Sequence, residues 1–164
     1  MRFFSDYSKN SSFRTNMNAD IELCHIGCED LDTAIEFDCL EHFRRFFRGA
    51  DMLDRRHTTL LHVTSNMKSP RVLEYLLEMG EIDVNSVDSY GYTPLHLAVR
   101  QSQDGFTASV ENIRRCTRLL LNYGADPCVN IFGKKRTPID LADDDEEVVE
   151  MLDTAFEIKD PGFE

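Results

Sequence analysis

The chain has 164 residues, of which 41% are hydrophobic, and its 18 Lys and Arg against 30 Asp and Glu give a formal net charge of −12. This length fits one domain with a real core, and the negative charge argues against direct binding of nucleic acid or of an anionic membrane. No segment reaches the roughly 18 apolar residues of a membrane span, and five cysteines without a paired framework favour a reducing, cytoplasmic or nuclear location.

Residues 1–20 are rich in Ser and Asn and lack the apolar core of a secretory signal. We expect them to form a disordered N-terminal tail.

Four residues after this tail have C-x3-C and C-x2-H spacing and by spacing alone could supply zinc ligands: Cys24, Cys28, Cys39 and His42. The alternative is that Cys39 and His42 lie on a helix with an apolar stripe of Leu40, Phe43 and Phe47, where cysteine serves as a small hydrophobe. Because the paired spacing typical of a zinc-binding turn is missing, we expect no metal and no cofactor.

Residues 90–100, YGYTPLHLAVR, predict a turn followed by a short helix. Thr93 is suited to cap the free N–H groups, and Pro94 fits the first helical position, where its missing N–H would have no partner. One apolar stripe then follows at i, i+3 and i+4: Leu95, Ala98 and Val99.

The same pattern recurs at a spacing of about 34 residues. DRRHTTLLHVTS (54–65) aligns with DSYGYTPLHLAV (88–99), and RTPIDLAD (136–143) repeats the Thr-Pro start with Asp140 in the histidine position. A second apolar helix and a glycine follow in RVLEYLLEMG (71–80) and IRRCTRLLLNYG (113–124).

A period of about 33–34 residues with T-P-L-H-x-A resembles the ankyrin repeats. The resemblance implies an all-α solenoid of about four helix-turn-helix units joined by β-turn or hairpin loops. We expect this ankyrin-repeat domain at 21–158, with units at 31–53, 54–87, 88–129 and 130–158, and a C-terminal tail at 159–164. The third unit departs from the pattern through roughly ten extra residues, QSQDGFTASV (101–110).

His62 and His96 recur with the repeat, so we assign them a structural role beside the capping threonines. The chain shows no nucleophile turn and no phosphate-binding glycine loop, and we expect no enzymatic activity. The acidic run DDDEEVVEML (143–152) is predicted to begin the last helix, where the helix dipole favours negative charge.

Stacked repeats align their turn tips along one edge, beside the concave face of their first helices. Tyr and Arg, which are enriched at binding hot spots, occur among the candidates. The predicted partner-binding residues are Arg55, Arg56, His57, Ser89, Tyr90, Tyr92, Lys134, Lys135 and Arg136 at the tips, Asn66, Met67, Arg100 and Gln101 beside them, and Phe106 of the insertion. We expect a monomer that binds a protein with an acidic surface and an apolar notch.

The resemblance implies a protein–protein interaction module that regulates or inhibits its partner, and one hypothesis is an inhibitor similar to the IκB-like inhibitors of Rel/NF-κB transcription factors. The alternative is a substrate-receptor or adaptor subunit of a modifying complex of the ubiquitin-ligase type. The resemblance also makes Asn85 a candidate for hydroxylation, because asparaginyl hydroxylase targets in this loop carry a leucine eight residues upstream, the place of Leu77.

Overall fold

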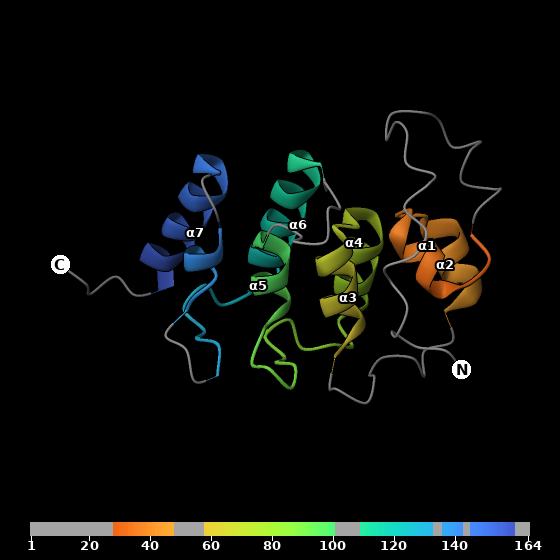
Figure 1. Ribbon diagram of the computed structural model, residues 1–164, viewed down its shortest axis with the longest axis horizontal. Coiled ribbons are helices and arrows are strands. Elements are labelled where there is room, and N and C mark those ends of the chain that lie inside the picture. Colours follow the sequence, from red (N-terminus) through yellow and green to blue (C-terminus); the bar gives the residue numbers. More distant parts are fainter. Residues whose placement is uncertain (1–27, 48–57, 101–108, 133–135, 143–144, 160–164) are drawn as a thin grey trace.

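The computed structural model describes residues 28–47, 58–100, 109–132, 136–142 and 145–159 (Figure 1). These residues form seven α-helices and one 3-10 helix, and none of them forms a β-strand. In chain order the elements are α1 (Leu31–Glu36), α2 (Leu40–Phe46), α3 (Leu60–Met67), α4 (Pro70–Met79), α5 (Pro94–Val99), α6 (Val110–Asn122), η2 (Ile139–Leu141) and α7 (Glu146–Lys159). The predicted all-α solenoid is confirmed.

The helices stack in two layers (Figure 1). The first helix of each pair contacts the first helix of the next, so that α3 lies between α1 and α5, and α5 contacts η2. The second helices do the same, with α4 between α2 and α6 and α7 against α6. The loops that precede α5 and η2 extend beyond the helices on the same side of the stack.

A reciprocal cap begins α3 and α5. The N–H of Thr59 donates to Nδ1 of His62 at 3.2 Å and the N–H of His62 donates to the Thr59 hydroxyl at 3.4 Å, and the same two bonds join Thr93 and His96 at 3.1 and 3.4 Å. These bonds satisfy N–H groups that a helix start would otherwise leave without partners. The structural role predicted for both histidines is confirmed.

His62 also links one repeat to the next. Because its Nδ1 accepts a hydrogen bond, the ring proton lies on Nε2, which donates to the carbonyl of Tyr92 at 2.9 Å. Nε2 of His96 faces the carbonyls of Arg136 and Val129, which partly offset the burial that lowers the pKa of His96. None of the described residues reaches this Nε2 with normal hydrogen-bond geometry.

Carboxylates replace this arrangement at the two ends of the stack. Asp30 accepts from the N–H of Thr33 at 2.9 Å to cap α1, and Asp140 accepts from the N–H of Thr137 at 2.8 Å before η2. An ionised carboxylate only accepts hydrogen bonds. Asp140 therefore preserves the cap but cannot donate onward as His62 does.

The core follows both layers without a break, and buried side chains come from every α-helix from α1 to α7. Each is removed from water, which stabilises the fold by roughly 25 cal/mol per Å² of apolar surface. The large core side chains that are fully or almost fully buried include Ile35, Phe43, Leu61, Leu73, Leu76, Leu95, Leu120 and Leu152.

Lys68 is a buried cation between two repeats. It ends α3 in the left-handed conformation at φ 56°, and its side chain is 2% exposed. Its Nζ donates to the carbonyl of Leu97 near the end of α5, where the helix dipole favours a positive charge. Burial lowers its pKa to about 8.

Ion pairs join α6 to the last helix. Arg114 lies 3.1 Å from a carboxylate oxygen of Asp145 and Arg118 lies 3.0 Å from one of Glu147. Asp145 also accepts from the N–H groups of Glu147 and Val148 at the start of α7, at 3.1 and 3.3 Å. The predicted capping role of the acidic run is confirmed for Asp145; residues 143 and 144 lie outside the described part.

Candidate functional site

The turn before α5 exposes one aromatic side chain to solvent. Asp88 accepts from the N–H groups of Tyr90 and Tyr92, both at 2.9 Å, and the N–H of Gly91 donates to the Asp88 carbonyl at 3.0 Å. Gly91 adopts φ 84°, which side chains rarely tolerate. With the turn fixed in this way, the side chain of Tyr90 is 60% exposed.

The neighbouring loop adds a second exposed aromatic residue, Phe132, which is 64% exposed. A Cβ at Gly91 would lie 2.5 Å from the backbone nitrogen of Phe132 and 2.7 Å from its ring. Because Gly91 has no side chain, the two loops can touch. Tyr90 and Phe132 therefore lie on adjoining loops. We call these two residues the aromatic tips.

The sequence analysis missed Phe132, although the signal was present. Tyr90-Gly91 and Phe132-Gly133 are the same aromatic-glycine step at equivalent places in two turns. Each loop is closed by a backbone hydrogen bond, from Asp88 N to Tyr92 O at 2.9 Å and from Ile131 N to Arg136 O at 3.0 Å. Comparing the turns alone, rather than the helices, would have identified it.

Two predicted binding residues meet behind the tips. The ring of Tyr92 stands edge-on to His96, with centroids 6.0 Å apart, and the guanidinium of Arg100 lies 5.7 Å from the Tyr92 centroid. This geometry allows a cation–π contact that fixes the direction of Arg100. The charge of Arg100 therefore lies against Tyr92, which follows Tyr90 by two residues.

The other predicted binding residues divide into two groups. Ser89 and Arg136 are exposed in the loops, and Asn66 and Met67 are half-buried at the end of α3. The remaining candidates lie outside the described residues: Arg55, Arg56, His57, Gln101, Phe106, Lys134 and Lys135. Of the insertion, Val110 already forms the first residue of α6.

Three of the four residues considered as zinc ligands converge. The ligand atoms of Cys28, Cys39 and His42 all lie within 4.8 Å of one another, and Cys39 Sγ is 3.0 Å from His42 Nδ1. Burial, and then the charge of Asp30, raise the pKa of the Cys28 thiol. Cys39 carries a disulfide whose other half lies outside the described residues, whereas the sequence analysis expected no cysteine pair.

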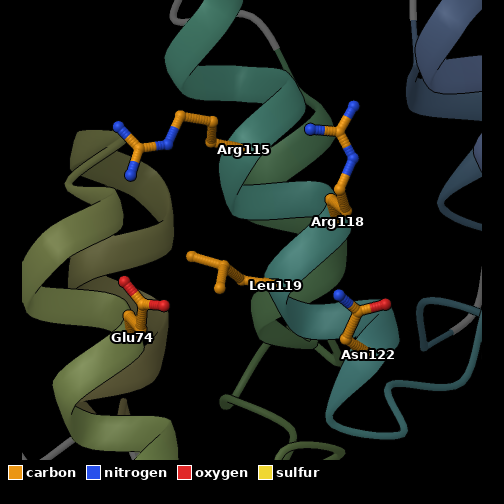
Figure 2. Close-up of a pocket in the computed structure, with 5 residues that line it drawn as sticks. All are labelled: Glu74, Arg115, Arg118, Leu119 and Asn122. Carbon is orange, nitrogen blue, oxygen red and sulfur yellow. The ribbon is translucent and has the colours of Figure 1, made fainter.

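A shallow depression of about 210 Å³ lies between α4 and α6 (Figure 2). It is lined by Glu74, Arg115, Arg118, Leu119 and Asn122, and Leu119 points into the space between the two helices. Small-molecule sites are usually larger enclosed clefts. The depression between the second helices is smaller and more open than such sites.

Asn85 ties its loop to the following repeat. Its Nδ2 donates to the carbonyl of Gly124 at 3.1 Å, and its Oδ1 accepts from the N–H of Asp126 at 2.7 Å. Both ends of the side-chain amide are therefore occupied across the junction.

Within the described residues, no helix combines the length and the apolar content needed to cross a membrane.

Comparison with known proteins places these features in a family. A model of ankyrin repeats in three copies matches residues 31–111. Ankyrin repeat-containing protein YGL242C of Saccharomyces cerevisiae is 37% identical over 103 residues, which cover 59% of this chain and 53% of the yeast protein. Delta-latroinsectotoxin-Lt1a of Latrodectus tredecimguttatus is 32% identical over 82 residues, which cover 48% of this chain and 6% of the toxin.

This chain thus spans about half the length of the yeast relative and a small part of the toxin. The matched region contains the capped helix pairs α1–α2 and α3–α4 and the whole of α5. Ankyrin repeats form an interaction fold, which serves protein–protein binding and is not an enzyme fold. The matches and the stacked, histidine-capped helices agree, and the chain belongs to the ankyrin-repeat family.

Proposed function

We propose that this chain binds a partner protein through the aromatic tips and the residues beside them. The observation that carries the proposal is the exposure of Tyr90 and Phe132, at 60% and 64%, on two loops that touch through Gly91. Exposed apolar side chains that lie next to one another often mark a binding site, and aromatic residues are enriched at binding hot spots.

The charges around the tips define the partner's chemistry. Arg136 is exposed in the same loop as Phe132, and Arg100 is held against Tyr92. These cations lie on a chain of net charge −12, so they attract acidic groups locally while the chain as a whole repels them. The proposed partner surface is an apolar notch for the aromatic tips, with carboxylates at its rim.

The finer proposal is that binding blocks the partner, as in an IκB-like inhibitor of Rel/NF-κB-type factors. A rigid, preformed surface is suited to this role because it loses little conformational freedom on binding. The alternative is an adaptor subunit of a ubiquitin-ligase-type complex, which needs two binding surfaces. The depression between α4 and α6 supports the alternative, because it lies on the layer of second helices, whereas the tips precede the first helices.

Replacing Tyr90 or Phe132 with alanine is expected to weaken partner binding by about 10- to 30-fold each, which corresponds to the roughly 1.4–2 kcal/mol of a hot-spot residue. The partner is first identified by affinity purification and mass spectrometry, and is then titrated in purified form by calorimetry. Tyr123→Ala is the matched control, since Tyr123 is 43% exposed but follows α6. Affinity unchanged in both tip variants would refute the proposed surface.

Hydroxylation of Asn85 is a second proposal, which concerns regulation. A hydroxyl group on the β-carbon leaves both amide atoms free to keep their bonds to Gly124 and Asp126, so the effect on stability should be small. We expect the peptide 72–100 from an animal cell to carry one added oxygen. Because Met79 in this peptide also oxidises, fragment ions must place the oxygen on Asn85; a peptide with unmodified Asn85 would contradict the proposal.

A further inference from the structure

Two cysteines and a histidine cluster at the N-terminal end of the stack, away from the aromatic tips. Cys28 precedes the Asp30 cap of α1, Cys39 is the residue before α2, and His42 lies in the first turn of α2. The turn between the helices, in which Asp38 adopts φ 50°, folds α2 back against α1. This fold brings Cys28 close to Cys39 and His42, which lie three residues apart at the start of α2.

The distances between the three ligand atoms come within about 1 Å of those in a tetrahedral zinc site. Zn–S bonds of about 2.3 Å and Zn–N bonds of about 2.0–2.1 Å place the ligand atoms about 3.6–3.8 Å from one another. Here the atoms of Cys28, Cys39 and His42 are at most 4.8 Å apart, and the Cys39–His42 distance is 3.0 Å. Changes of about 1 Å or less, within the range of side-chain rotation, would bring all three onto one metal ion.

The ligand types and the local charge favour the same metal. Two thiolates and one imidazole are ligand types that zinc prefers in proteins. The carboxylate of Asp30, which caps α1 two residues after Cys28, adds a negative charge near the cluster that attracts a divalent cation. The start of α2 places Cys39 and His42 three residues apart, as the start of α3 does with Thr59 and His62, but it does not explain why the thiol of Cys28 converges on them.

We propose that the reduced chain binds one Zn²⁺ through Cys28, Cys39 and His42, and that the disulfide at Cys39 is the metal-free, oxidised state of the same site. Three protein ligands leave the fourth tetrahedral position to a water molecule. This proposal replaces the sequence-based expectation that the chain binds no metal.

The two states interconvert by balanced chemistry. A dithiol reductant cleaves the disulfide: each of the two sulfur atoms gains one electron and one proton, and the reductant closes into its own disulfide. Zn²⁺ then displaces the thiol protons of Cys28 and Cys39 and binds the neutral imidazole of His42. In the reverse direction, oxidised glutathione accepts the two electrons, the disulfide forms again and the metal leaves.

The test is a metal measurement on the full chain. We expect the reduced protein to hold about one Zn²⁺ per chain after dialysis, and Co²⁺ in its place to show thiolate charge-transfer and tetrahedral ligand-field bands. Cys28→Ser and His42→Ala should lose the metal while far-UV circular dichroism keeps its helical signal. Cys128→Ser, a half-buried cysteine in another repeat, is the matched control and should bind as the wild type does.

A reduced wild-type chain without bound metal would overturn the proposal, and so would equal binding by the wild type and Cys28→Ser. The Co²⁺ spectrum of the wild type decides the question even where a variant fails to fold, because thiolate bands require cysteine ligands. Treatment with oxidised glutathione should release the zinc, and a dithiol should restore binding. Equal zinc affinity in the oxidised and reduced chains would refute the coupling to the disulfide.

Discussion

Leu95→Ala is expected to lower the free energy of unfolding by about 2–5 kcal/mol, as large-to-small changes do at fully buried sites. Leu95 is 0% exposed and belongs to α5, which contacts α3, α6 and η2. A cavity at this point would remove contacts from both adjoining repeats at once. Thermal and urea denaturation measure the change, at roughly 2–4 °C of Tm per kcal/mol for a chain of this size.

Ile158→Ala is the matched control, because Ile158 also loses aliphatic carbons but is 77% exposed. Its effect should stay within about 0.5 kcal/mol, as is usual at the surface. A melting temperature for Leu95→Ala within a degree of the wild type would contradict the burial of Leu95 and the stacking of α5 between its neighbours.

The second large effect concerns pH and Lys68. Its folded pKa of about 8 lies below the ordinary value of 10.5, because burial disfavours the ammonium form. Between pH 8 and pH 10.5 the unfolded chain therefore binds more protons at this residue than the folded chain does. The free energy of unfolding should rise with pH across this window, by about 3 kcal/mol at about 1.4 kcal/mol per pKa unit.

The measurement compares the wild type with Lys68→Met by urea denaturation at pH 7, 8, 9 and 10. Other groups titrate in both proteins, so the difference between the two curves isolates Lys68. Burial raises the pKa of the neighbouring Cys116 to about 12, which keeps its thiol protonated across the window. Parallel curves for the two proteins would show that the amine of Lys68 is as readily charged in the folded chain as in water.

The repeat architecture could be predicted from sequence because its determinants are local. Thr93, Pro94 and His96 act within one turn of helix, and the buried Leu95 follows from its spacing alone. The same local rule held for Asp140, whose carboxylate takes over the bond of the histidine. In each case the partner residue lies three positions away in the chain.

Lys68 and Phe132 could not be predicted by that rule because their environment comes from another repeat. A lysine is normally exposed, and only the end of α5, 29 residues further on, supplies the carbonyl that holds its ammonium group. The position of Phe132 depends on Gly91 in the preceding loop, because a side chain at Gly91 would collide with Phe132. The spacing of the cysteines likewise does not predict how close Cys28 lies to Cys39 and His42, because this depends on the turn between α1 and α2.

The stacking of neighbours has a consequence for how the chain reaches its folded state. The main helix contacts join elements of one pair or of adjacent pairs, as from α3 to α4 and α5. The described helices therefore find their partners within about one repeat along the sequence, which keeps the loops to be closed short. Any helix pair that forms first offers an edge on which the next can assemble, so the nucleus is not tied to one place in the sequence.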